Sequence, residues 1–165
     1  HDVNGEFIGY LGTCFDVSDR HQAAEQLRLV ASVFSHTHEG IMITDANNVI
    51  VNVNEAFCAI TGYSREDVIG RNPSMLKSPN QTPQFYQTMW QELNTAGYWQ
   101  GEVWNRKKNG DTYAELLTIS AVFGPDGELN NYVGIFADIT IQKEHEKRLE
   151  HLAHYDQASA RRLPA

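Results

Sequence analysis

The spacing of hydrophobic and polar residues changes twice along the chain. Residues 18–36 and 141–154 are polar with helical spacing, whereas much of the segment between them alternates apolar with polar residues. Alternation, together with β-branched and aromatic residues, predicts five strands, at residues 41–44, 49–54, 99–107, 112–123 and 131–138. Three helices are predicted between the second and third strands, at residues 55–61, 64–69 and 82–95. The predicted order is ββαααβββ, with a further helix at each end.

Turn-forming residues separate the predicted strands. Asp45-Ala46-Asn47-Asn48 joins the first two strands, and these residue types tolerate the left-handed backbone of a tight turn. Asn109-Gly110 and Asp126-Gly127 separate the last three strands, and both pairs are strong hairpin signals. The sequence therefore predicts antiparallel pairing between consecutive strands.

Two segments of the chain resemble each other. Residues 5–18 and 127–140 align without a gap and share Gly, Glu, Tyr, Gly and Asp in the same places. A turn pair precedes each copy and a polar helical stretch follows it. We therefore predict that residues 1–18 are the last strand of a preceding module and that residues 19–32 are a linker helix. The main domain is predicted at residues 33–140.

Composition excludes several classes of protein. The 165 residues are 41% hydrophobic, which is enough for one compact core with appended segments. A net charge of -8 provides no basic surface for nucleic acid, and no apolar run approaches the roughly 20 residues of a membrane span. Cys14 and Cys58 match neither a disulfide framework nor a Cys-x-x-Cys metal site, which favours a cytoplasmic location.

Five motifs accompany the predicted elements. They are GIMITD at residues 40–45, VNEAF at 53–57, TGYSREDVIGRN at 61–72, RKKNG at 106–110 and DIT at 138–140. With the order of elements, they resemble the PAS family over residues 33–140. The resemblance implies an α+β PAS fold, in which a five-stranded antiparallel sheet carries short helices on one face and cups a small pocket. It also implies that residues 1–18 belong to a preceding PAS-like module.

Two further segments indicate a signalling context. The run WQGEVWNR at residues 99–106 resembles bacterial PAS modules that precede GGDEF diguanylate cyclase domains, which make cyclic di-GMP. LEHLAHYD at residues 149–156 is similar to the linker and first residues of such a cyclase. The resemblance implies an output linker helix at residues 141–156 and a downstream cyclase, with or without a phosphodiesterase domain. Similarity stops after Asp156, so residues 157–165 are expected to be foreign to the natural chain.

Strand alternation predicts which side chains face the pocket. If Asn105 points inward, Val103 and Lys107 share its face, and the next strands contribute Tyr113, Glu115, Leu117, Ile119, Gly134, Phe136 and Asp138. The candidate ligand contacts are Asn72, Trp90, Trp99, Asn105, Tyr113, Glu115, Leu117 and Phe136. The outer face, with Trp104, Leu116, Thr118 and Ile135, is too apolar for water, so a helix or a second subunit is expected to cover it.

The resemblance limits the choice of cofactor. LOV photoreceptors of this family form an FMN adduct through a Cys after the Asn of a Gly-Arg-Asn segment, but Pro73 follows Asn72 here. Of their three inward amides only the one at Asn105 is retained, so an FMN adduct is not expected. Residues 72–83, with Trp90, Trp99, Asn105 and Glu115, resemble FAD-binding redox PAS domains. FAD stays an alternative, beside the interpretation of both tryptophans as ordinary core residues.

Haem is not expected. Haem-binding PAS domains supply a ligand His from the long helix beside the pocket, and residues 82–95 contain none. All seven histidines lie in the predicted flanks or at the edge of the domain: His1, His21, His36, His38, His145, His151 and His154.

Glu115 needs a partner if it faces an apolar cavity, because an unpaired buried carboxylate is costly. A polar ligand, Lys107 or the amide of Asn105 would satisfy it. In the alternative orientation, Glu115 turns outward to solvent.

Asp138 and Thr140 are similar to the exit motif of the family, which implies a role in signal relay. Asp138 is expected to accept bonds from backbone amides, and Thr140 is expected to be the N-cap of the output helix. That helix is too polar and short for a stable coiled coil alone. We therefore expect a parallel homodimer held by the flanking helices and the outer sheet face.

The motifs distinguish three classes of function. No nucleophile elbow, phosphate loop or metal-ligand cluster accompanies the acidic residues, so this segment is not expected to be an enzyme. The first remaining interpretation is a sensor that binds a small ligand and relays a signal through its C-terminal helix. The second is a ligand-free dimerisation module.

Overall fold

The computed structural model describes the backbone of residues 14–162 and the side chains of residues 19–162. It divides into two units at residue 36, and α1 (Cys14–His36) is the described part of the first. The strand predicted before this helix falls mainly on residues 1–13, which lie outside the described residues. Because α1 begins at Cys14, residues 14–18 are helical, and the predicted linker helix lies entirely within α1.

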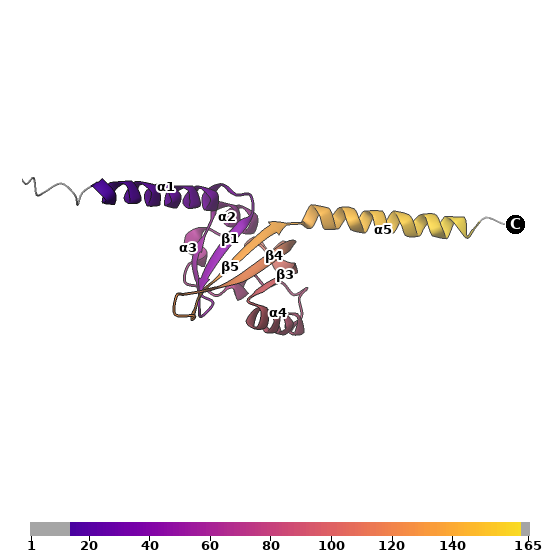
Figure 1. The fold of residues 1–165 in the computed structure, drawn as a ribbon. Helices are drawn as coiled ribbons and strands as arrows, with labels where there is room; N and C mark the ends of the chain where they lie inside the picture. Colours follow the sequence, from indigo (N-terminus) through magenta and orange to yellow (C-terminus); the bar gives the residue numbers. More distant parts are fainter. Residues whose placement is uncertain (1–13, 163–165) are drawn as a thin grey trace, which may run out of the picture. The chain divides into compact units, whose positions relative to one another are not determined.

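The second unit is built on one five-stranded antiparallel sheet (Figure 1). Its order is β2-β1-β5-β4-β3, so the last strand of the sequence lies in the middle. The strands are β1 (Gly40–Asp45), β2 (Ile50–Val53), β3 (Tyr98–Arg106), β4 (Thr112–Phe123) and β5 (Leu129–Asp138). The predicted strands are confirmed to within two residues at each end.

Side-chain caps fix where the helices between β2 and β3 begin. The helices are α2 (Glu55–Thr61), α3 (Arg65–Val68), the 3₁₀ helix η1 (Pro73–Leu76) and α4 (Pro83–Ala96). Each follows a residue whose side chain accepts a backbone N–H of its first turn: Asn54, Ser64, Asn72 and Thr82. The 3₁₀ helix was not predicted, although Asn72 followed by Pro73 favours such a start.

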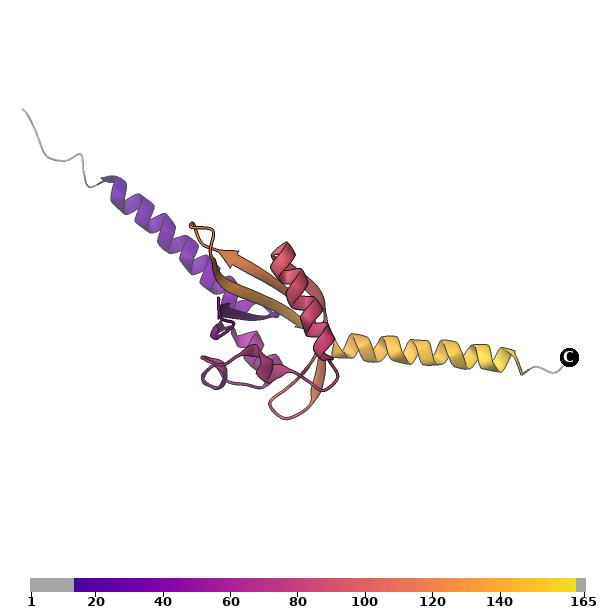
Figure 2. The same cartoon turned by 90° about the horizontal axis from the view of Figure 1, so that it is seen from below.

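All of these helices pack on one face of the sheet. Phe57 of α2 is fully buried and meets Phe136 of β5 edge to face, with ring centroids 5.8 Å apart. At the other end, Met89 and Leu93 of α4 form a second buried cluster with Val103 of β3. Figure 2 shows α4 running alongside the strands of the sheet. The α+β class, the five-stranded sheet and the one-sided placement of the helices are therefore confirmed.

The C-terminal helix α5 (Thr140–Ala160) continues from β5 through a single residue, Ile139. It has no buried residue. The helix runs beyond the predicted end at residue 156, so residues 157–160, which were expected to be a separate tail, are helical. Within residues 14–162, no helix combines the length and the apolar character needed to cross a bilayer.

Candidate functional site

A cavity of about 340 Å³ lies between the inner face of the sheet, η1 and α4. Its walls are mainly apolar, with contributions from all three of these parts of the fold. Six of the predicted ligand contacts line it: Asn72, Trp90, Asn105, Glu115, Leu117 and Phe136. Residues as far apart in sequence as Met42 and Phe136 meet there because β1 pairs with β5.

Two predicted contacts do not line this cavity. Trp99 is buried against α4, where it meets Phe85 edge to face with ring centroids 5.8 Å apart. Its ring lies over Gly101, where a Cβ atom would approach the ring to 2.6 Å. Tyr113 is buried in the core cluster of α2, α3 and the sheet. Both residues were assigned to the correct face of the sheet, but each lies beyond one end of the cavity.

Glu115 is the principal polar group of the cavity. Its side chain is directed inward and is only 2% exposed, so the outward orientation is wrong. Oε1 accepts a hydrogen bond of 2.9 Å from Nδ2 of Asn105. Oε2 has no hydrogen-bond partner among the described residues. The predicted need for a partner is therefore met at one of the two carboxylate oxygens.

Burial raises the pKa of Glu115 to about 8, because the charged form loses its hydration. The nearby hydroxyl of Tyr113 and the amide of Asn105 act in the opposite direction, and the charge of Asp138 adds to the increase. Tyr113 is close enough to influence the carboxyl group, but its hydroxyl is not placed to form a hydrogen bond. Glu115 is therefore mainly neutral at pH 7.

Tyr86 and Lys77 also line the cavity and were not predicted. The Tyr86 hydroxyl is buried without a hydrogen-bond partner among the described residues, and burial together with the charge of Glu115 raises its pKa. Nζ of Lys77 lies 4.1 Å from the centroid of the Tyr86 ring. Tyr86 comes four residues before Trp90, so the two side chains lie on the same face of the predicted helix. This spacing was the sequence signal that could have identified Tyr86.

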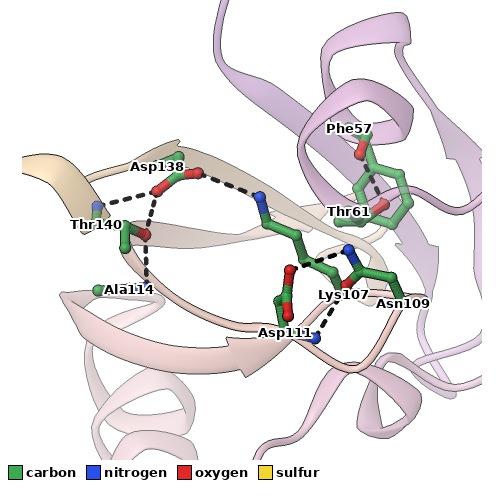
Figure 3. A network of polar contacts seen from close by, with 8 residues as sticks. All are labelled: Phe57, Thr61, Lys107, Asn109, Asp111, Ala114, Asp138 and Thr140. Atoms are coloured by element: carbon green, nitrogen blue, oxygen red, sulfur yellow. Dashed lines mark hydrogen bonds and ion pairs between the residues drawn. The ribbon is translucent and has the colours of Figure 1, made fainter.

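The end of β5 is tied to the start of α5 by a small polar network (Figure 3). Oδ1 of Asp138 accepts hydrogen bonds from the backbone N–H of Thr140 at 3.0 Å and from its hydroxyl at 2.5 Å. Oγ1 of Thr140 in turn accepts from the backbone N–H of Ala114 at 3.1 Å. The predicted role of Asp138 as an acceptor for backbone amides is thus confirmed.

The prediction that Thr140 is the N-cap of α5 is wrong. The helix begins at Thr140 itself, and the residue before it, Ile139, makes no side-chain cap. Thr140 is instead engaged with Ala114 of β4, and Asp138 supplies the acceptor for its N–H. Asp138 lies at the rim of the inner face, with its side chain 31% exposed and Oδ2 3.9 Å from Nζ of Lys107.

The donor set of the cavity limits the groups that it accommodates. No histidine occurs among its lining residues, and no cluster of three potential metal ligands occurs within the described part of the chain. The available polar partners are the carboxyl group of Glu115, the ammonium group of Lys77, two phenols and several amide and hydroxyl groups. These groups fit a small organic molecule that has an apolar body and a few hydrogen-bonding atoms.

Comparison with known proteins identifies relatives of modest identity. The nitrogen fixation regulatory protein of Klebsiella oxytoca is 34% identical over 125 residues, which are 76% of this chain and 25% of that protein. Phototropin-1B of Oryza sativa subsp. japonica is 29% identical over 126 residues, which are 76% of this chain and 14% of that protein. The chain therefore spans a quarter or less of the length of these relatives.

A solved structure and a family model agree on the domain. The PAS domain of a protein from Colwellia psychrerythraea superimposes with a TM-score of 0.65 at 26% identity, covering 70% of this chain and 98% of that one. The model of the PAS domain family matches residues 38–140, which closely follows the predicted domain at residues 33–140. This match covers more than half of the residues, so the chain belongs to the PAS domain family and carries one of its sensory domains.

Proposed function

We propose that this PAS domain binds a small organic ligand in the cavity and relays its presence through α5 to an output domain. The observation that carries the proposal is Oε2 of Glu115, which is buried in the cavity without a partner among the described residues. An unsatisfied buried polar atom costs about 1–3 kcal/mol, and a ligand with a matching group removes that cost.

We propose further that the output is a GGDEF-type diguanylate cyclase, with an upstream PAS-like module on the other side. The supporting feature is the run at residues 149–156, which resembles the linker to such a cyclase, and the helix α5 that contains it. The upstream module is supported by the similarity between residues 5–18 and residues 127–140. Any catalytic activity of the full-length protein then belongs to the output domain.

FAD is the second candidate for the ligand. The supporting observation is that Trp90, Asn105 and Glu115, three of the four single residues that carry the resemblance to FAD-binding redox PAS domains, line the cavity. Pro73 lines it as well, at the position where an FMN adduct needs a cysteine. A flavin here would be held without a covalent bond, with Asn105 and Glu115 as its polar partners.

Filling the cavity should abolish ligand binding. Leu117→Trp places a large side chain in the cavity, whereas Leu116→Trp makes the same change on the outer face of the same strand. The readout is a co-purified chromophore or the thermal shift that a library compound produces. We expect the Leu116→Trp protein to keep this readout and the Leu117→Trp protein to lose it. A ligand at about 100 times its Kd stabilises the protein by about 2.7 kcal/mol, so the loss is readily measured.

An absorption spectrum of the purified protein distinguishes the candidates. A flavin band supports the second candidate. A colourless protein that responds to a library compound supports another ligand. The ligand-free dimerisation module is supported if no compound shifts the melting temperature and Leu117→Trp leaves the relay unchanged, and that result contradicts the sensor proposal.

We propose that the domain forms a parallel homodimer through its outer sheet face and flanking helices. Leu116 and Ile135 leave the outer face partly apolar, and Ile135 is 37% exposed. Ile135→Glu should weaken dimerisation at least about tenfold, because it places a carboxylate in the proposed interface on each copy, and the loss of its hydration costs more than about 1.4 kcal/mol. Ile69→Glu is the matched control, because Ile69 is 38% exposed at the end of α3 on the opposite side of the sheet.

Sedimentation equilibrium measures the dimer dissociation constant of each variant. Equal dissociation constants for Ile135→Glu and Ile69→Glu would place the interface elsewhere. A protein that is monomeric at the highest concentration reached would contradict the dimer.

A further inference from the structure

Glu115 and Asp138 are direct cross-strand partners in the pairing of β4 with β5. Side chains at such paired positions lie on the same face of the sheet, with Cβ atoms about 5 Å apart. The carboxyl group that faces the ligand cavity is therefore the neighbour of the carboxylate that holds the first residue of α5. Like charges directly opposite each other in a sheet are destabilising.

Lys107 lies beside Asp138 and beside Tyr113, the neighbour of Glu115 on the inner face. Its Nζ lies 3.9 Å from Oδ2 of Asp138 and 5.6 Å from the centroid of the Tyr113 ring. Tyr113 comes two residues before Glu115 on the same face of β4. Figure 3 shows the Lys107 side chain reaching Asp138 at the junction with α5. A new negative charge on Glu115 would compete with Asp138 for this cation.

The groups that surround Glu115 come from every element packed around the cavity. These groups are Tyr86 of α4, Lys77 after η1, Asn105 of β3, Lys107 after the end of β3, Tyr113 of β4 and Asp138 of β5. Of these, Asp138 is the group that links Glu115 to the start of α5. The pairing in the sheet makes this link independent of which ligand occupies the cavity.

We propose that the charge on Glu115 is what the domain transmits: ionisation of Glu115, favoured by a ligand with a cationic or N–H donor group against Oε2, draws Lys107 from Asp138 and loosens the first turn of α5. The inference rests on the proposed relay through α5. It specifies the chemistry of the ligand, and it names the loss of the Glu115 proton as the event that passes the signal to α5. While Glu115 is neutral, Lys107 pairs with Asp138, and Asp138 in turn holds Thr140.

Because the carrier is a proton on Glu115, alkaline pH should imitate the ligand. Burial raises the pKa of Glu115 to about 8, so the group ionises between about pH 7 and pH 9 in the empty domain. By linkage, the binding of a cationic or N–H donor probe then releases a proton, and the affinity for the probe increases through the same pH range.

Hydrogen exchange of the junction amides tests the inference in the ligand-free protein. The amides of Thr140, bonded to Asp138, and Lys143, bonded to Ile139, report the first turn of α5. Their protection factors, relative to amides at the centres of β3 and β4, should fall about two- to fivefold between about pH 7 and pH 9. Infrared difference spectra should show the carboxylic acid of Glu115 ionising over the same range.

Glu115→Gln should remove this step, because glutamine cannot ionise. Glu102→Gln is the matched control, since the Glu102 carboxylate also contacts α5, through Lys143 at 2.7 Å, but is exposed and lies outside the cavity. In the Glu102→Gln control, the protection factors of the junction amides should be lower by the same factor at all pH values. Their fall between about pH 7 and pH 9 should remain. If Glu115→Gln does not fold, Asp138→Asn provides a second test, because loss of the neighbouring charge should lower the pKa of Glu115.

Three results would overturn the inference. The first is a fall in amide protection between about pH 7 and pH 9 that persists in Glu115→Gln. The second is ionisation of Glu115 without any change in protection at the junction. The third is a Glu115 that stays protonated through about pH 10. If a bound ligand loosens α5 while Glu115 stays neutral, the proposed relay survives and this carrier does not. If a bound ligand leaves α5 unchanged, the proposed function itself fails.

Discussion

Replacing Glu115 with glutamine should stabilise the protein by about 3 kcal/mol at pH 7, and the gain should vanish near pH 4. Glutamine keeps the shape of the side chain, and its carbonyl oxygen can accept the hydrogen bond from Asn105. It also removes an ionisable group whose pKa rises from 4.5 in the unfolded chain to about 8 in the folded one. Only the wild-type protein then has a pH-dependent cost of burying a carboxyl group.

The sign follows from the protons that each state binds. Between about pH 4.5 and pH 8 the folded wild-type protein keeps the proton of Glu115 and the unfolded chain has lost it, so unfolding releases a proton. The free energy of unfolding therefore falls by about 1.4 kcal/mol for each pH unit in this range. Below about pH 4.5 both states are protonated and the full stability is present.

Urea unfolding of both proteins between about pH 4 and pH 9 measures this difference. Glu102→Gln is the matched control, since its exposed carboxylate should change stability by less than about 1 kcal/mol. A gain that is constant with pH would show that glutamine acts through packing. A loss of stability at pH 7 would mean that Glu115 is ionised and paired in the folded protein.

Most of the fold could be predicted from the sequence because its signals are local. Turn pairs such as Asn109-Gly110, together with the alternation within β4, predicted a strand at residues 112–123. Both ends agree with the observed strand. The 3₁₀ helix η1 was missed because four residues are too few to display a period. The end of α5 was missed because it was judged by resemblance to other proteins, and residues 157–160 form helix regardless of where that resemblance stops.

The candidate site was predicted less completely, because alternation gives the face of a strand but not the depth at which a helix covers it. Asn105, Glu115 and Phe136 were correctly assigned to the cavity on this basis. Trp99 faces the same side, but it lies under the part of α4 that carries Phe85 and packs into the core. Such a difference depends on helix packing, which no pattern within one strand reports.

Asn54→Ala should destabilise the protein by about 3 kcal/mol, because one buried side chain joins the start of β1 to the first turn of α2 by three hydrogen bonds. Oδ1 accepts from the backbone N–H of Phe57 at 3.0 Å, as the cap of α2, and from that of Ile41 in β1 at 2.8 Å. Nδ2 donates to the carbonyl of Glu39 at 2.9 Å. Alanine removes all three bonds and leaves polar backbone groups without partners, at about 1 kcal/mol for each bond.

The matched control is Thr82→Ala, which removes a cap of the same kind from α4. Thr82 accepts a single bond, from the backbone N–H of Phe85 at 3.2 Å, and is exposed, so its loss should cost about 1 kcal/mol. Asn54→Asp should fall between the two, because it keeps both acceptor bonds and loses only the donor to Glu39. Urea unfolding at one pH ranks the three variants. Equal losses for Asn54→Ala and Thr82→Ala would show that Asn54 acts as a helix cap alone and that its bonds to Ile41 and Glu39 contribute no net stability.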